Sequence, residues 1–184
     1  MALTDRHDGP DPARAGADKE RVPSDPRLGP DLIRAVADND LARAEALLRQ
    51  GAPASFVLSE WGDEASIGMR FVRQSAKETE TPVLYVACRL RNVDMVKLLL
   101  SHGADPNARF HDYWVDDGCR MQGHWETCLG AAFPSVEMVS VLLEAGADPT
   151  LCWSQGPGLE WGLLAAAAGD PALLEVLRRH GCGR

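Results

Sequence analysis

The chain has 184 residues, of which 45% are hydrophobic, so it can bury one sizeable core and a single domain is the default expectation. Its formal net charge is −8 and its isoelectric point lies near 5.1. Binding to DNA or RNA depends on Lys and Arg side chains that neutralise phosphates and release counterions, and this charge opposes it. We therefore expect no nucleic-acid partner.

The first residues contain no apolar run of signal-peptide length, and no window of about 18 apolar residues predicts a membrane span. We expect no membrane partner. The five cysteines form an odd set without a close pair, which is typical of reduced thiols and predicts a cytoplasmic protein, with the nucleus as the alternative. They are Cys88, Cys119, Cys128, Cys152 and Cys182.

The N-terminal segment, residues 1–30, is expected to be a disordered tail. It contains five prolines among charges of both signs and almost no large apolar residue. Such a segment cannot bury enough apolar surface to offset the entropy that it loses on ordering. A docking or regulatory peptide is the alternative interpretation. The folded part is predicted to start near Asp31.

From there onward, a short phrase that contains glycine recurs in four places. In each copy, leucines on one face of a helix are followed by a glycine. Glycine just past the last turn accepts the left-handed backbone conformation at low steric cost. Each copy therefore predicts the end of an amphipathic helix. The copies cover residues 47–52, 99–106, 142–149 and 177–182.

A second helix, rich in small residues, is predicted upstream of each of these ends. Small side chains allow the two helices of a pair to approach closely. These segments are residues 32–37, 84–88, 129–132 and 163–168.

The paired helices resemble the ankyrin-repeat family, whose repeat of about 33 residues runs through a β-turn and two helices with a Thr-Pro-Leu-His-x-Ala signature. The most complete copy starts with Thr81-Pro82-Val83-Leu84-Tyr85-Val86-Ala87, which holds one extra residue after the proline, and ends with Gly103-Ala104-Asp105-Pro106. The resemblance implies an all-α fold, an ankyrin-repeat solenoid of helix pairs with β-hairpin finger inserts. Within a domain over residues 31–184, four repeats are expected at 31–53, 81–107, 127–150 and 162–184.

The glycines of the repeated phrase are 52, 43 and 35 residues apart, so the connections are longer than the family implies. The additional residues are expected in finger inserts at 54–80, 108–126 and 151–161. In the first finger, residues 55–61 and 67–73 are apolar-rich halves of a predicted hairpin. In the second, residues 109–115 and 119–125 flank an Asp-Gly turn, and in the third, residues 151–153 and 159–161 flank a glycine-rich turn.

All five tryptophans fall in these fingers, and such side chains are enriched at interfaces because they desolvate a large area with few rotatable bonds. Tyr85, at the start of an inner helix, is expected as a flanking contact. The alternative is that the finger aromatics pack on one another and support hairpins that are marginal alone. The predicted partner-binding residues are Trp61, Phe71, Tyr85, Tyr113, Trp114, Arg120, Trp125, Trp153 and Trp161.

Carboxylates also cluster on the first two fingers, where they would favour a basic partner through electrostatic steering. The alternative is that they are solvated turn residues, and arginines in the same fingers oppose a simple acidic patch. The carboxylates are Glu60, Asp63, Glu64, Asp112, Asp116 and Asp117.

The second finger holds possible zinc ligands in His111, Asp112, Cys119 and His124, with Cys128 just beyond it, and Cys119 or Cys128 could form a nucleophilic pair with His124. Structural zinc sites usually offer close Cys-x-x-Cys or His-x-x-x-His pairs, and the sequence has none. Phosphate-binding glycine loops are missing as well. We expect no cofactor, no metal and no catalytic residue, with a small enzyme or a zinc-binding site on the second finger as the alternative.

The family resemblance implies a non-enzymatic protein–protein interaction module. The partner is expected on the concave inner-helix face and on the aromatic-rich fingers, and the chain is expected to be a monomer. A purely structural or oligomeric role is a third possibility.

Overall fold

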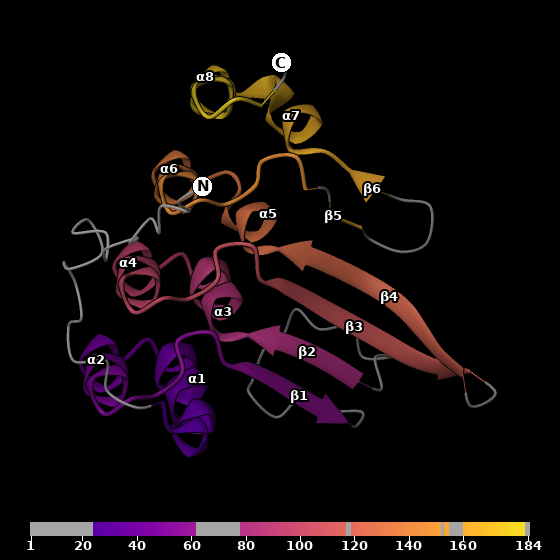
Figure 1. The fold of residues 1–184 in the computed structure, drawn as a ribbon. Helices are drawn as coiled ribbons and strands as arrows, with labels where there is room; N and C mark the ends of the chain where they lie inside the picture. Colours follow the sequence, from indigo (N-terminus) through magenta and orange to yellow (C-terminus); the bar gives the residue numbers. More distant parts are fainter. Residues whose placement is uncertain (1–23, 62–77, 117–118, 152, 155–159, 183–184) are drawn as a thin grey trace, which may run out of the picture.

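The computed structural model describes residues 24–61, 78–116, 119–151, 153–154 and 160–182. In these residues, helices occur in consecutive pairs and strands lie between the pairs (Figure 1). The helices are η2 (Pro26–Leu28), α1 (Gly29–Ala37), α2 (Leu41–Arg49), α3 (Val83–Arg89), α4 (Val93–Ser101), α5 (Cys128–Ala132), α6 (Val136–Glu144), α7 (Leu163–Ala166), η3 (Ala167–Gly169) and α8 (Pro171–Arg179). The strands are β1 (Val57–Trp61), β2 (Glu78–Pro82), β3 (Arg109–Asp116), β4 (Cys119–Thr127), β5 (Trp153–Ser154) and β6 (Glu160–Trp161).

The helix pairs stack in two rows, with α1, α3, α5 and α7 beside α2, α4, α6 and α8 (Figure 1). Apolar side chains from both rows are buried between them, such as Leu84 of α3 and Leu99 of α4. These residues belong to one continuous hydrophobic core. No helix in the described part of the chain is long and apolar enough to cross a bilayer.

Two residues after each helix of the second row lies a glycine in the left-handed conformation, as the repeated phrase predicts. The N–H of the following residue donates to a carbonyl of the last helical turn, for example Ala104 to Leu99 at 3.1 Å. This bond satisfies a carbonyl that the helix itself leaves without a partner. The φ angles are 96°, 87°, 93° and 89° at Gly51, Gly103, Gly146 and Gly181.

The second-row helices also begin alike, because a polar side chain precedes each of them. Asn92, for example, accepts a hydrogen bond from the Met95 N–H at 2.9 Å. The first backbone N–H groups of a helix have no acceptor within it, and such caps satisfy one of them. The four capping residues are Asp40, Asn92, Ser135 and Asp170.

Side chains in the connecting loops link the loop after the first helix pair to the loop after the second, and that loop to the loop after the third. The Ser55 hydroxyl donates to the Gly103 carbonyl and accepts from the Asp105 N–H, both at 3.1 Å. In the next loop, the Asn107 side chain donates to the Gly146 carbonyl at 3.3 Å and accepts from the Asp148 N–H at 2.7 Å. These repeated bonds hold the stacked pairs at a regular spacing.

The fingers join into one antiparallel sheet, so the predicted all-α class is wrong. Within the described residues, the strand order is β1-β2-β3-β4-β5-β6, and β2 pairs with β3 just as β4 pairs with β5. Single hairpins leave two unpaired edges and are marginal in water, whereas pairing between fingers satisfies their backbone groups. The fold is a mixture of helix and strand and fits ankyrin-like repeats only loosely.

The first finger also pairs differently from the sequence pattern. β1 pairs with β2, and Val57 lies opposite Pro82. The sequence pattern instead predicts that residues 67–73 form the second strand of this hairpin. Those residues lie outside the described residues. The hairpins of the second and third fingers form as predicted, β3 with β4 and β5 with β6.

The folded part begins before the predicted boundary at Asp31. Helix α1 starts at Gly29, and the Asp25 N–H donates to the Gly51 carbonyl at 2.8 Å. Residues 1–23 of the predicted tail lie outside the described residues.

We predict that Gly29→Ala destabilises the chain. A Cβ at Gly29 would lie 2.2 Å from Cδ2 of Phe56. Alanine is favoured over glycine in a helix by about 1 kcal/mol, but displacing the ring costs about 1–3 kcal/mol. Gly169→Ala is the control, because nothing lies within 4 Å of its added Cβ. Urea unfolding measures both, and a Gly29→Ala chain more stable than wild type would contradict the packing.

Candidate functional site

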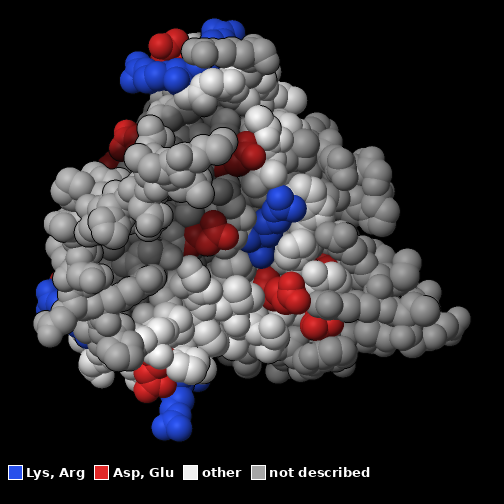
Figure 2. All heavy atoms as spheres, in the orientation of Figure 1, with Lys and Arg blue, Asp and Glu red and all other residues white. Residues whose placement is uncertain are grey.

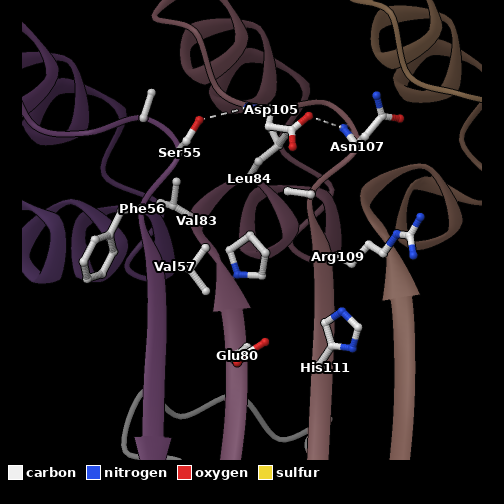
Figure 3. Close-up of a pocket in the computed structure, with 13 residues that line it drawn as sticks. Ser55, Phe56, Val57, Glu80, Val83, Leu84, Asp105, Asn107, Arg109 and His111 are labelled. Carbon is white, nitrogen blue, oxygen red and sulfur yellow. Dashed lines mark hydrogen bonds between the residues drawn. The ribbon is translucent and has the colours of Figure 1, made fainter. Parts of the chain in front are cut away.

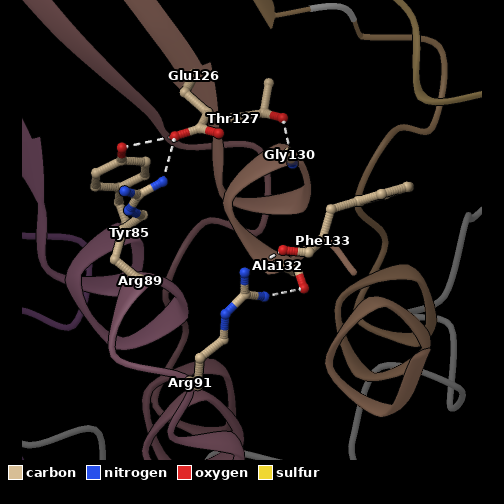
Figure 4. Close-up of polar contacts among 8 residues, drawn as sticks. All are labelled: Tyr85, Arg89, Arg91, Glu126, Thr127, Gly130, Ala132 and Phe133. Carbon is tan, nitrogen blue, oxygen red and sulfur yellow. Dashed lines mark hydrogen bonds and ion pairs between the residues drawn. The ribbon is translucent and has the colours of Figure 1, made fainter. Parts of the chain in front are cut away.

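The finger sheet meets the first row of helices at the side chain of Tyr85. Its ring stacks on Phe110 of β3, with ring centroids 4.9 Å apart and an interplanar angle of 12°. Both side chains are buried. The Tyr85 hydroxyl donates to Oε2 of Glu126 at 2.7 Å (Figure 4). One residue of α3 therefore holds β3 by packing and β4 by a hydrogen bond.

Side chains along β3 alternate between the two faces of the sheet. Phe110 and Asp112 lie on the face that contacts α3, and we call this the helix face. Arg109, His111 and Tyr113 lie on the opposite face, which we call the outer face. The two faces present different chemistry.

On the helix face, Asp112 compensates for an irregularity in β4. The register shifts between His111 and Tyr113, so that β4 carries one more residue than β3 at this point. Such a bulge leaves a backbone group without its ladder partner. The Asp112 carboxylate accepts a hydrogen bond from the His124 N–H, and the His124 ring lies 5.9 Å from that of Phe110. Asp112 is buried and has a structural role here.

Arg89 and Glu126 carry the charge at the junction. Nη1 of Arg89 lies 3.5 Å from Oε2 of Glu126, and their side chains are 33% and 13% exposed. Water therefore still reaches the cation while the carboxylate is largely covered. Arg89 stands at the rim of the helix face, where a charged group of another molecule can approach it.

The surroundings of Tyr85 keep its hydroxyl protonated. Burial raises the pKa of Tyr85 far above its usual value, and the Glu126 carboxylate raises it further through its charge and the hydrogen bond that it accepts. Arg89 lowers the pKa by a smaller amount. The hydroxyl is therefore a permanent donor to Glu126.

Arg91 fixes the next helix pair against this junction. Its guanidinium donates to the carbonyl of Ala132 at 2.5 Å and to the carbonyl of Phe133 (Figure 4). These carbonyls lie at the end of α5, where a helix has no internal donors left for them. The turn after α3 is thus bound to the turn after α5.

The outer face carries stacked aromatic rings and a cation. His111 stacks on Tyr113 with centroids 5.7 Å apart, and the Tyr113 hydroxyl donates to Glu80 at 3.4 Å. Arg109 lies over the ring of Trp125, 5.4 Å from its centroid. A guanidinium over an indole face is attracted by the ring quadrupole.

Of the predicted partner-binding residues whose side chains the structure describes, Tyr85 lies in the core and Tyr113 and Trp125 lie on the outer face. Tyr85 is 1% exposed, so it positions other groups and offers no surface to a partner. The structure describes only the backbone, in strands of the sheet, for Trp61, Trp114, Arg120, Trp153 and Trp161. Phe71 lies outside the described residues.

Sequence reasoning missed Arg89 and Glu126, which lie 37 positions apart and meet only in the fold. The one available signal is that Arg89 follows Tyr85 by four residues on a helix, and this spacing places both side chains on one face.

The alternative site of Cys119, His124 and Cys128 is not assembled. Cys119 begins β4 and Cys128 directly follows it, so their backbones are about 30 Å apart at about 3.3 Å per residue. A hydrogen bond with Cys88 raises the pKa of the buried Cys128 thiol, and burial raises it further. Within the described ranges, no group of three His, Cys, Asp or Glu residues is placed to hold a metal ion.

We predict that Tyr85 makes the chain sensitive to alkali. In the unfolded chain a tyrosine ionises near pH 10, whereas the folded chain keeps Tyr85 neutral. The stability that neutral Tyr85 contributes is therefore fully present below that pH and is lost progressively as the pH rises above it. Above pH 10, the free energy of unfolding of wild type should fall more steeply than that of Tyr85→Phe, by up to about 1.4 kcal/mol per pH unit. Denaturant unfolding at several pH values measures this, and equal slopes would contradict the burial.

Comparison with known proteins identifies the repeat. Residues 80–110, which include α3 and α4, match a family model described as the ankyrin repeat. The chain is also 38% identical over 78 residues to the 2-5A-dependent ribonuclease of Mus musculus, which is 42% of this chain and 8% of that protein. The chain therefore spans less than a tenth of the relative's length. On these two matches, the chain contains an ankyrin repeat at residues 80–110 and is similar to an ankyrin-containing protein.

Proposed function

We propose that this chain is a non-enzymatic protein-binding module and that a partner protein contacts the angle between α3 and the helix face of the finger sheet. The ankyrin repeat supports a protein-interaction role in general. The observation that favours this surface is the Tyr85 contact, which joins helices and sheet into one surface. A surface that is rigid before binding loses less conformational entropy when a partner docks.

Arg89 is the residue that we propose as the central partner contact. Its side chain is one third exposed beside a carboxylate that is largely covered. The cation is positioned by Glu126 and stands at the edge of a low-dielectric surface, where charge interactions are stronger than in bulk water. We propose that a carboxylate of the partner approaches this exposed part of the cation and forms a charge-assisted hydrogen bond with it.

Protein binding also fits the chemistry of the cysteines. Cys88, Cys128 and Cys182 are free thiols and all three are buried, which supports a structural role in a reducing compartment. We propose the cytoplasm or the nucleus as this compartment, and separately we propose that the chain acts as a monomer. The similarity to the mouse ribonuclease supports only the presence of the repeat in this chain, because the shared segment is 8% of that protein.

We predict that Arg89→Gln weakens partner capture about tenfold. Glutamine keeps a hydrogen-bond donor for Glu126 but removes the cation. Arg179→Gln is the matched control, because Arg179 is 70% exposed on α8 and pairs only with Glu175 among the described residues. Affinity capture from cell extract, quantified by mass spectrometry, should show proteins held by wild type and by the control and lost with Arg89→Gln. Equal capture by both variants, with equal thermal midpoints, would contradict the proposal.

We further predict that Cys128 is unreactive in the native chain. The thiolate is the nucleophile in alkylation, and burial and hydrogen bonding disfavour it here. Iodoacetamide should modify Cys128 on the order of a hundred times more slowly in native than in urea-unfolded protein, as measured on its peptide by mass spectrometry. Modification faster than that of an unfolded cysteine would support the enzyme alternative instead.

A further inference from the structure

The outer face of the sheet carries a hollow of about 310 Å³ where β1, β2 and β3 leave the helices (Figure 3). Charged side chains that line it already have partners within the chain. Asp105 accepts the Asn107 N–H at 2.9 Å, and the guanidinium of Arg109 lies over the Trp125 ring. Figure 2 shows a basic side chain among acidic ones in the middle of the face that it views. The charges of this region are therefore largely compensated internally.

Arg91, in the turn between α3 and α4, has a backbone conformation that is unusual for an arginine. Its φ angle is 61°, in the left-handed region. Among the described residues other than glycine, Asn39 alone shares this feature, with a φ of 60° in the equivalent turn between α1 and α2. Asparagine tolerates this conformation better than most residues do, and arginine has no such advantage. The backbone of the turn therefore does not explain why an arginine stands there.

The contacts of the Arg91 side chain explain the choice of residue. Its guanidinium donates to the Ala132 carbonyl at 2.5 Å and to the Phe133 carbonyl (Figure 4). In the turns after α1 and α3, all three residues return a backbone N–H to the helix. In the turn after α5, Phe133 and Ser135 do so, whereas Pro134 has no N–H to donate. Arg91 adds donors from the neighbouring helix pair at this position.

The same part of the chain also holds the other end of α5. Glu126 lies two residues before this helix, and the Tyr85 hydroxyl donates to it at 2.7 Å. Arg89 lies 3.5 Å from the same carboxylate oxygen. Helix α5 has five residues, and so short a helix makes few bonds of its own. Its position therefore depends on the contacts that α3 and the following turn make before and after it.

We propose that Arg91 is a positioning residue, which fixes α5 along α3 and thereby keeps Glu126 beside Arg89. With the guanidinium in place, both ends of α5 are held by one segment of the chain. Without it, only the end at Glu126 is held, and the end of β4 can move together with the helix.

The inference rests on the proposed function only for the role of Arg89 in binding. Its test uses the purified full chain without a partner, so failure of this test and failure of partner capture are separate results.

Two variants separate this role from that of a plain turn residue. Arg91→Asn places in the second turn the residue type that the first turn already uses, and it removes the guanidinium. Arg91→Lys keeps the cation and the same backbone demand, but a single ammonium replaces the planar, two-pronged donor.

We expect the thermal midpoint to fall from wild type to Arg91→Lys and further to Arg91→Asn. The Arg91→Asn chain should unfold about 3–6 °C below wild type, because two hydrogen bonds from a charged group are lost. A residue that serves the backbone alone gives a different order. Arg91→Lys would then equal wild type, and Arg91→Asn would be the most stable of the three.

NMR spectra show whether the effect reaches Glu126. In Arg91→Asn, the amide signals of Glu126 and Thr127 should shift, and nuclear Overhauser effects between the Tyr85 ring and the Glu126 side chain should weaken. Arg179→Gln is the control, because Arg179 is 70% exposed on α8, and it should leave these signals unchanged.

An Arg91→Asn midpoint at or above that of wild type would overturn the proposal. So would Overhauser effects at Glu126 that equal those of wild type. If the Arg91→Asn chain does not fold, Arg91→Lys decides, and a midpoint equal to that of wild type would overturn the proposal.

Discussion

The buried side chain of Tyr85 provides the contact on which both faces of the finger sheet depend. Its ring packs on Phe110 and its hydroxyl donates to Glu126, so a packing interaction and a charge-assisted hydrogen bond act on two adjacent strands. A buried carboxylate without donors is costly, and Tyr85 supplies one donor from the helix row. The orientation of the sheet relative to the helices follows from this junction, and so does the position of Arg89 at its rim.

The two faces of the sheet differ because their polar groups are satisfied in different ways. On the helix face, the carboxylates of Asp112 and Glu126 are covered and accept hydrogen bonds from neighbouring residues. Glu80 on the outer face and Asp105 in the loop after α4 also accept hydrogen bonds, but they line an open hollow together with Val57 and Pro82. A partner that met only the helix face would therefore recognise a different charge pattern from one that reached around the sheet, and one partner could engage both.

The sequence predicts the parts of the fold that depend on local chemistry. Glycine at positions such as Gly103 must adopt a positive φ to end a helix, and the Asp-Gly turn marks the hairpin of β3 and β4. It does not predict strand β2, whose Glu-Thr-Glu-Thr-Pro sequence lacks apolar alternation although Thr79 and Thr81 are buried. Because the sequence pattern does not predict β2, it does not predict that the first finger pairs with the second. The sequence therefore suggests separate hairpins on an all-α fold.

The candidate site escapes prediction for the same reason. The sequence marks Tyr85 as an aromatic residue near a surface, but its burial depends on Phe110, which pairing within the sheet brings to α3. The hollow likewise needs Val57, Glu80 and Asp105 from three separate segments. Local patterns identify helix ends and turns, whereas these sites arise from contacts between distant segments.

The continuous sheet is the central claim, and nuclear Overhauser effects across the fingers test it most directly. Antiparallel pairing of β2 with β3 places Thr79 opposite Asp112 and Glu80 opposite His111. Cross-strand contacts between these residues, together with ring contacts between Tyr85 and Phe110, are the predicted result. Contacts confined to the β1–β2 and β3–β4 hairpins, with none between β2 and β3, would show separate fingers and contradict the account.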